Sequence, residues 1–317
     1  MAGSGRDRQP QAGVALVLVL WVIALLTIVA VSQVTTQRTE LGMTLNSRQE
    51  QAGRAAVEAG MNYVLWHLLR GRGDTRPRTG WPRNGQPREW SFAGHRIRVR
   101  AVPESARIDL NHAGSGLLAG LLRAAGLGPD RVARVRDAIL DWRDPDNDRH
   151  LNGAELRDYR AAGLPYGARN GAFETVDELR RVLGVDPALF ERIAPALTVY
   201  SGRRSINPIY ASPLVLRSLP GMAGSQVNAY LESRRQRLAL GQPVLLPVGV
   251  SASDVSDKIV PVYRIRAEAR MPDGIRVSGE MVVKLNSRRV YEVLDRTYPL
   301  PPPADDREKA GGQEAKR

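Results

Sequence analysis

A long apolar run near the start of the chain dominates its pattern of hydrophobic and polar positions. Residues 14–31 are eighteen positions with one polar side chain, Thr27, and no charge. This length suffices for a helix that crosses a bilayer and exceeds that of an ordinary secretory signal core. The sequence therefore predicts a membrane-spanning helix over residues 14–31.

Helical periodicity continues past the apolar run. No proline occurs from Val14 to Leu69, so we expect one helix over residues 14–70, roughly 80 Å long at about 1.5 Å per residue. The alternative is a plain signal anchor followed by a separate helix. Small or apolar side chains recur on one face of the predicted helix at Val34, Leu41, Leu45, Ala52, Ala56, Ala59 and Tyr63.

Two later stretches have the period of β-strands. Residues 90–102 alternate between apolar side chains and arginines, which predicts a strand or hairpin within residues 71–107. Residues 260–271 and 275–285 are β-rich and are separated by Pro272-Asp273-Gly274, a strong hairpin signal. A further strand is expected at 289–298, completing a strand region over 251–298. The Pro-rich, charged residues 299–317 are expected to be disordered.

Between the strand regions the pattern is helical. We expect an inserted helical domain over residues 108–200 and a second helical hairpin unit over 201–250, with Asn111 capping the first helix. Helix, strand, helical insertion and antiparallel strands together predict an α+β fold. The individual helices are expected at residues 117–125, 131–142, 154–162, 176–183, 187–194, 212–219 and 224–237.

The composition indicates a basic surface and excludes several kinds of catalytic and metal site. The net charge is +13, but the arginines are scattered, which favours a solvated basic surface over a nucleic-acid footprint. There is no cysteine, and the four histidines have no metal-ligand spacing. No Gly-rich phosphate loop and no nucleophile elbow occurs in the sequence. We expect a protein that is not an enzyme.

The flanks of the apolar run predict its processing and orientation. The small pair Ala12-Gly13 precedes the run, so a cut after Gly13 would remove a leader, residues 1–13, and keep the helix from Val14 onward. Arg6 and Arg8 lie before the run, and the first charge after it is Arg38. This asymmetry predicts a single-pass protein with a cytoplasmic N-terminus.

An acidic loop is the strongest candidate for binding chemistry. Counted from Asp144, carboxylates stand at positions one, three, five and twelve, a spacing that suits the oxygen ligands of calcium. Arg149 replaces the glycine expected at position six of an EF-hand, so a different calcium loop that braces the helical region is expected. The alternative is an acidic helix-capping loop paired with arginines. The candidate ligands are Asp141, Asp144, Asp146, Asp148, Asn152 and Glu155.

Helix–glycine–helix hairpins recur in the helical region. One follows residues 108–113, another surrounds Leu219-Pro220-Gly221, and a third follows Phe173. Such hairpins can present backbone N–H groups to a phosphate, but they are also common packing units. We favour the structural interpretation.

These features together resemble the minor pseudopilin K of the type II (general) secretion pathway. The likeness rests on Ala12-Gly13-Val14 with its apolar helix, residues 108–113, Asp141-Trp142-Arg143-Asp144, Asn152-Gly153-Ala154-Glu155 and Leu219-Pro220-Gly221. It covers nearly the whole chain.

The resemblance implies a pilin-like fold with calcium in its helical insertion, cleavage after Gly13 by prepilin peptidase, and methylation of Val14. It also implies a location in the bacterial inner membrane and a periplasmic C-terminal domain. The implied partners are the minor pseudopilins I and J, the major pseudopilin and the inner-membrane assembly platform, with no nucleic acid.

Leu18 stands where most pilin-like subunits carry a glutamate. In a helical bundle that glutamate would neutralise the amine of a neighbour inside lipid, where an unpaired charge is costly. A subunit without it suits the top of a filament, where it would cap and initiate the pseudopilus. The alternatives are a membrane-anchored DNA-binding protein of competence type and a signal-anchored calcium-dependent enzyme.

Overall fold

The computed structural model describes residues 12–70, 85–271, 274–286 and 291–298, without the side chains of residues 12–15 and 29–48. The chain divides into two compact units, Met1–Ala55 and Ala56–Arg317. The predicted leader, residues 1–13, and the predicted disordered tail, residues 299–317, lie outside the described residues apart from the helical backbone at positions 12 and 13.

Helix α1 (Ala12–Arg70) confirms the prediction of one continuous helix and excludes a break after the apolar run. Within its first unit the apolar side chains from Leu16 to Ile28 are exposed, and Thr27 donates its hydroxyl to the Ile23 carbonyl at 2.7 Å. In the described part of the chain no helix is both long and apolar enough to cross a membrane. The side chains at both ends of the predicted span, residues 14–31, lie outside the described part.

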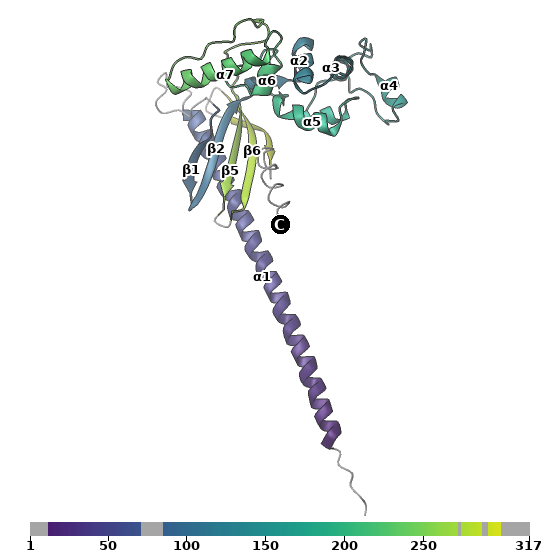
Figure 1. The fold of residues 1–317 in the computed structure, drawn as a ribbon, viewed down its shortest axis with the longest axis vertical. Helices are drawn as coiled ribbons and strands as arrows, with labels where there is room; N and C mark the ends of the chain where they lie inside the picture. The colour runs from purple at the N-terminus through teal and green to yellow at the C-terminus, as the bar shows by residue number, and fades with distance from the viewer. Residues whose placement is uncertain (1–11, 71–84, 272–273, 287–290, 299–317) are drawn as a thin grey trace, which may run out of the picture. The chain divides into compact units, whose positions relative to one another are not determined.

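The second unit contains a five-stranded antiparallel sheet (Figure 1). Its order is β1-β2-β5-β6-β7, so β2 and β5 are neighbours in the sheet although about half of the chain separates them. The predicted strand or hairpin at 90–102 is a hairpin of β1 and β2, and the predicted hairpin of β5 and β6 also forms. A bulge between Val282 and Val283 interrupts the pairing of β6 with β7. The strands are β1 (Arg88–Phe92), β2 (His95–Pro103), β5 (Val262–Arg270), β6 (Arg276–Leu285) and β7 (Tyr291–Thr297).

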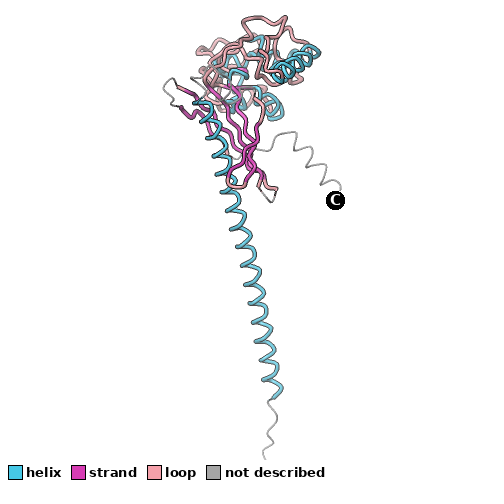
Figure 2. The backbone as a smooth tube through the Cα atoms, turned by 90° about the vertical axis from the view of Figure 1, so that its left-hand side faces the viewer, coloured by secondary structure: helices cyan, strands magenta, loops and turns pink. Residues whose placement is uncertain are grey.

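The end of α1 packs on one face of this sheet, where Figure 2 shows the strands beside the helix. The pleat puts alternate residues on this face, and Val57, Met61 and Val64 of the helix bury their side chains against it. A Cβ at Gly60 would come within 2.9 Å of Ile97 and of Val99, so glycine permits the close approach. Of the stripe predicted from Ala56 onward, only Ala56 is buried, whereas Ala59 and Tyr63 are half-buried, so the side of the helix that faces the sheet is centred on other residues than predicted.

The chain leaves the sheet at Pro103 and returns to it at Val262, and the helical region lies between these points. Mixed helix and antiparallel sheet confirm the α+β class. All the predicted helices form within one or two turns of their expected limits, although residues 176–181 are a 3₁₀-helix. The elements are η1 (Glu104–Ala106), β3 (Ile108–Asp109), α2 (Ser115–Ala124), α3 (Pro129–Arg143), α4 (Leu156–Ala161), η2 (Val176–Arg181), α5 (Pro187–Ile193), η3 (Ala194–Ala196), β4 (Leu197–Thr198), α6 (Pro213–Arg217) and α7 (Gly224–Ala239).

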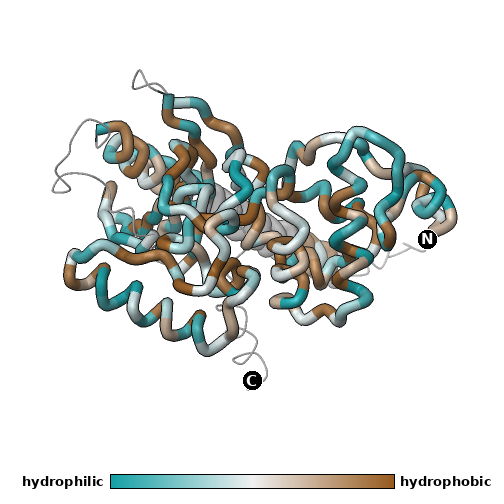
Figure 3. The backbone as a smooth tube through the Cα atoms, turned by 90° about the horizontal axis from the view of Figure 1, so that it is seen from above, coloured by the Kyte–Doolittle hydropathy of each residue, from teal (hydrophilic) through white to brown (hydrophobic). Residues whose placement is uncertain are grey.

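One hydrophobic core serves the whole helical region. Leu118 and Leu121 of α2 belong to the same buried cluster as Val215 and Leu216 of α6. Viewed from above (Figure 3), hydrophobic and hydrophilic residues alternate along the chain, as expected where each helix buries one side. A Cβ at Gly120 would come within 1.8 Å of the Ser218 carbonyl oxygen, so α2 and α6 pack in backbone contact. The predicted units 108–200 and 201–250 thus share a core.

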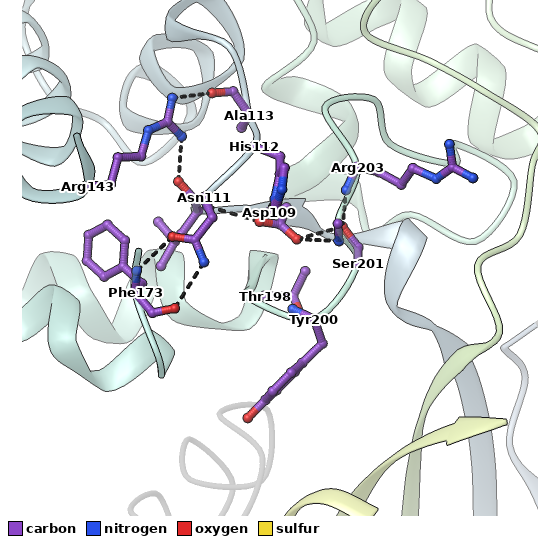
Figure 4. A network of polar contacts seen from close by, with 12 residues as sticks. Asp109, Asn111, His112, Ala113, Arg143, Phe173, Thr198, Tyr200, Ser201 and Arg203 are labelled. Atoms are coloured by element: carbon purple, nitrogen blue, oxygen red, sulfur yellow. Dashed lines mark hydrogen bonds and ion pairs between the residues drawn. The ribbon is translucent and has the colours of Figure 1, made fainter. Parts of the chain in front are cut away.

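Asn111 does not cap the first helix, which corrects the prediction. The N-cap residue of α2 is Gly114. The Asn111 side chain instead donates to the Phe173 carbonyl at 3.0 Å and accepts the Phe173 N–H at 2.7 Å (Figure 4). An amide offers both a donor and an acceptor, so it can join two segments as a backbone would. Asn111 therefore ties the chain before α2 to a loop 62 residues away.

Buried Asp109 organises the same region (Figure 4). One carboxylate oxygen accepts the Ser201 hydroxyl at 2.9 Å and the Gly202 N–H at 2.8 Å. The other accepts the Asn111 N–H at 2.9 Å and lies 3.0 Å from His112 Nδ1. A buried carboxylate with this many donors is satisfied. The motif at residues 108–113 therefore has a structural role.

Candidate functional site

The acidic loop begins at the end of α3 and reaches α4. Asp141, in the last turn of α3, is fully buried and accepts hydrogen bonds with both oxygens. Its Oδ1 accepts the His150 N–H at 3.0 Å, and its Oδ2 accepts the Ala154 N–H at 2.6 Å. A helix residue thus fixes the path of the loop that follows it.

Close contact with Asp141 requires a glycine at position 153 of the loop. A Cβ at Gly153 would lie 1.8 Å from Asp141 Oδ2, far inside any contact distance. The Asp141 carboxylate therefore occupies the space that a side chain would need. This explains the glycine in Asn152-Gly153-Ala154-Glu155 without any requirement for a positive φ.

Three potential ligands converge beside this loop. Ligand atoms of Asp141, Asp144 and His150 lie within 4.8 Å of one another. His150 Nδ1 is 2.5 Å from Asp141 Oδ1 and 3.8 Å from Asp144 Oδ2. A carboxylate can only accept, so Nδ1 carries the hydrogen in this contact.

Two carboxylate oxygens near this group have no hydrogen-bond partner. These atoms are Asp144 Oδ1 and Glu155 Oε1, both buried. Burial and the charges of Asp146 and Asp141 raise the pKa of Asp144, and His150 and Arg143 oppose this shift. Burial, with the charges of Asp141 and Asp144, likewise raises the pKa of Glu155. The carboxylates repel one another, and a buried unpaired oxygen is costly.

The remaining predicted ligands lie differently. Asp146 is exposed, and its Oδ1 accepts the backbone N–H of Asp148 at 2.9 Å. The Asn152 side chain donates to Asp137 Oδ2 at 3.1 Å and so belongs to a neighbouring pair. The structure therefore brings together Asp141 and Asp144, places the charges of Asp146 and Glu155 close enough to act on them, and turns Asn152 toward Asp137.

Sequence reasoning missed two participants, His150 and Asp137. His150 was passed over because the spacing of the acidic loop points to oxygen ligands. Asp137 is four residues before Asp141, so helical spacing places both on one face of α3 and could have found it. Asp137 is nearly fully buried, and its Oδ1 accepts a hydrogen bond from Arg136 Nε at 2.6 Å.

The cluster fits a hard divalent cation in its donor set and size. Calcium takes oxygen ligands at about 2.3–2.6 Å, so two oxygens on one ion are separated by up to about 5 Å. The ligand atoms of Asp141, Asp144 and His150 meet that requirement, and the unpartnered oxygens of Asp144 and Glu155 are further potential donors. The imidazole of His150, a softer ligand, now lies against Asp141 as a hydrogen-bond donor, in the role that a cation would take.

We expect Gly153→Ala to abolish any calcium response of this loop. The added methyl group would displace the Asp141 carboxylate, which accepts the backbone N–H groups of His150 and Ala154. Calorimetric titration of the full-length protein with calcium measures the effect. The matched control is Gly224→Ala at the start of α7, where a Cβ would meet no atom within 4 Å and φ is not positive. Equal heats for parent and Gly153→Ala would contradict the expectation.

The three helix hairpins share a turn, and two of them carry a carboxylate at the start of the second helix. Gly126, Gly184 and Gly221 have positive φ angles of 90°, 88° and 86°. Asp130 lies in the first turn of α3, and Asp186 caps α5, accepting the Leu189 N–H at 2.7 Å and an ion pair from Arg131. Carboxylates at these helix starts would repel a phosphate.

The residues implicated in processing and assembly lie on α1. The backbone at Gly13 and Val14 is helical, and their side chains lie outside the described part. The Leu18 side chain is exposed.

Comparison with known proteins decides the family. The type II secretion system protein K of Pseudomonas aeruginosa is 30% identical over 253 residues, which cover 70% of this chain and 73% of that relative. The chain belongs to the type II secretion system protein K family. The family's own model, described as "Type II secretion system (T2SS), protein K", matches residues 99–202, and this segment contains the acidic loop and two of the three hairpins.

Other relatives agree with this membership. Protein K of Pectobacterium carotovorum subsp. carotovorum is 30% identical over 154 residues, and the match spans about half of each chain, 47%. A solved structure, the GspK-GspI-GspJ complex from enterotoxigenic Escherichia coli, has a similar chain with a TM-score of 0.56 and 17% identity. That match covers 84% of this chain and 99% of the other, and at this identity it shows the likeness of the fold.

Proposed function

We propose that this member of the family is a minor pseudopilin that caps and initiates the pseudopilus of a type II secretion system, without enzymatic activity. The observation that carries the proposal is the packing of the end of α1 on an antiparallel sheet, with a helical region between β2 and β5. We interpret this arrangement as pilin-like, with the helical region as its insertion. The apolar first part of α1 is then free to anchor the subunit and later to pack in a filament.

The proposed location is the bacterial inner membrane, with the C-terminal part in the periplasm. The charge asymmetry around residues 14–31 supports this orientation. Prepilin peptidase would cut between Gly13 and Val14, and Val14 would be methylated. Leu18 at the fifth mature position leaves the subunit without the glutamate that would meet a neighbour's amine, which suits the top of the filament.

Calcium is the proposed cofactor, held by Asp141, Asp144 and Glu155, with Asp146 in reach of the group. When bound, calcium would supply two positive charges, which would offset the repulsion between these carboxylates. Its role would be structural. With that charge in place, the loop between α3 and α4 is fixed against the buried Asp141. Asp148 and Asn152 are not needed in this arrangement.

The proposed partners are the minor pseudopilins I and J, together with the major pseudopilin and the inner-membrane assembly platform. The similar chain of the Escherichia coli structure belongs to a GspK-GspI-GspJ complex, which supports the first two. A nucleic-acid role is disfavoured because carboxylates stand at two of the three hairpin helix starts.

We expect the full-length chain, tagged at its C-terminus, to co-purify with the I and J subunits of the same system in equal amounts. The mature chain should begin at Val14 and carry one methyl group. Mass spectrometry of the purified complex measures both. Gly13→Asp should leave the leader attached, whereas Ala2→Asp, a matched change within the leader, should not. Recovery of the protein without I and J would refute the proposed assembly.

A further inference from the structure

A basic groove crosses the junction between the sheet and the helical region. It has a volume of about 1000 Å³ and runs between β2, η1, α6 and α7. Among the described residues that line the groove none is acidic. Five are arginines, Arg100, Arg107, Arg217, Arg234 and Arg235.

The carboxylates outside the groove do not balance these charges. Arg234 donates to the backbone carbonyls of Pro208 at 2.9 Å and Ala211 at 2.8 Å. Arg107 lies 3.6 Å from Glu104, but Glu104 is also paired with Arg264. Arg235 pairs with Glu232 on the exposed face of α7, an interaction of little strength. The groove therefore retains excess positive charge.

One arginine of the groove also has a like charge beside it in the sheet. Arg100 on β2 stands directly opposite Arg266 on β5, and like charges at such positions destabilise a sheet. Glu280 on β6 stands on the other side of Arg266 but is also paired with Arg264. Burial and the charge of Arg266 lower the pKa of Arg100, against the opposing effect of Glu280. Nη2 of Arg266 is buried without a hydrogen-bond partner. An anion bound in the groove, which Arg100 lines, would reduce the cost of this like-charge pair.

The uncharged part of the lining indicates the kind of anion. Val102, Leu214, Leu231 and Leu238 supply apolar surface between the arginines. Tyr210 is the single aromatic residue among the described lining positions, whereas single-stranded nucleic acids stack on several aromatic rings. Alternating apolar and cationic contacts suit a polypeptide with carboxylates and small apolar side chains.

We propose that this groove binds an extended acidic segment of a partner protein, with its carboxylates on Arg100, Arg217 and Arg235. The chain's own tail is a poor occupant, because residues 299–317 carry four acidic and four basic side chains. A second copy of the chain is unfavourable, since its net charge is +13. The inference does not depend on the proposed secretion role.

The test uses full-length protein in nonionic detergent and a fluorescein-labelled peptide of alternating aspartate and alanine. Fluorescence polarisation should show saturable binding that weakens with added salt, and the matching asparagine–alanine peptide should not bind. The double variant Arg217→Glu/Arg235→Glu should weaken binding at least tenfold. Both side chains are exposed, so circular dichroism should be unchanged.

The matched control is Arg157→Glu/Arg181→Glu, which makes the same change in net charge at exposed positions outside the groove. It should weaken binding less than threefold. An equal loss in both double variants would show general attraction to a basic protein and overturn the proposal. So would displacement of the peptide by an oligothymidine at lower concentration, which would indicate a nucleic-acid ligand, or by inorganic phosphate, which would indicate a small-anion site.

Discussion

Replacing Glu104 by glutamine should lower the free energy of unfolding by roughly 3–5 kcal/mol, the usual cost of breaking a buried ion pair. Glu104 is fully buried and binds Arg264 with both oxygens, at 2.8 and 3.2 Å. It also accepts the Thr198 hydroxyl. The variant would leave Arg107 and part of Arg264 without a counter-charge where the sheet meets the helical region. Urea unfolding followed by fluorescence of buried Trp142 measures the change.

The pH dependence identifies the ionised carboxylate as the cause. Burial favours the neutral form of Glu104, but Arg264 and Arg107 outweigh it and hold the pKa of Glu104 below its ordinary value of 4.5. A lowered folded-state pKa contributes stability above the unfolded-state pKa, and this contribution is lost as the pH falls through the folded-state value. The gap between parent and Glu104→Gln should therefore be full at pH 7 and shrink below about pH 4.5.

The matched control for this prediction is Glu232→Gln. Glu232 pairs with Arg235 on the exposed face of α7, where solvent screens the ion pair, so its loss should change the free energy of unfolding far less than Glu104→Gln does at any pH. A similar cost for both variants would refute a special role for Glu104.

Removing calcium should destabilise the protein by about 4 kcal/mol, if 1 mM calcium is compared with a chelator and the dissociation constant is about 1 µM. Without the ion, the buried carboxylates of Asp144 and Glu155 repel Asp141 and keep oxygens without partners. The thermal unfolding midpoint of the full-length protein in detergent, with and without chelator, measures the effect.

The variant Asp144→Asn should change the stability of the protein in a different way with and without calcium. It removes a repelling charge, so the chelated variant should be more stable than the chelated parent, whereas its response to calcium should be largely lost. Asp130→Asn, which changes an exposed acid at the start of α3, should keep the full response. A parent protein whose midpoint does not change on chelation would exclude a structural calcium site.

Much of the fold could be predicted because its signals are local. An uninterrupted helical period over residues 14–70, alternation at 90–102 and the turn at Pro272-Asp273-Gly274 each specify an element from neighbouring residues. The prediction of a cap at Asn111 failed because a local preference competed with a distant one. The amide is used by Phe173, and no spacing rule reveals a partner 62 residues away.

The candidate site, too, could be predicted from the sequence only in part. The run from Asp141 to Glu155 indicated a cluster of carboxylates, because acids this close must repel. Which of these carboxylates belong to the cluster could not be predicted, because that depends on burial. Asp141 is buried by α3 and by the chain folding back at Gly153, whereas Asp146 remains exposed. His150 enters the group through the shape of the loop, which the spacing of acids does not contain.

By itself, the sequence determined the elements, their order, the α+β class and the acidic loop, since periodicity, turn residues and charge density are properties of short segments. Only the tertiary structure decided what meets across long separations. It placed β2 beside β5, paired Glu104 with Arg264 and gathered five arginines in one groove. The physical reason is that such contacts depend on the packing of the whole core, where burial decides which charges must find a partner.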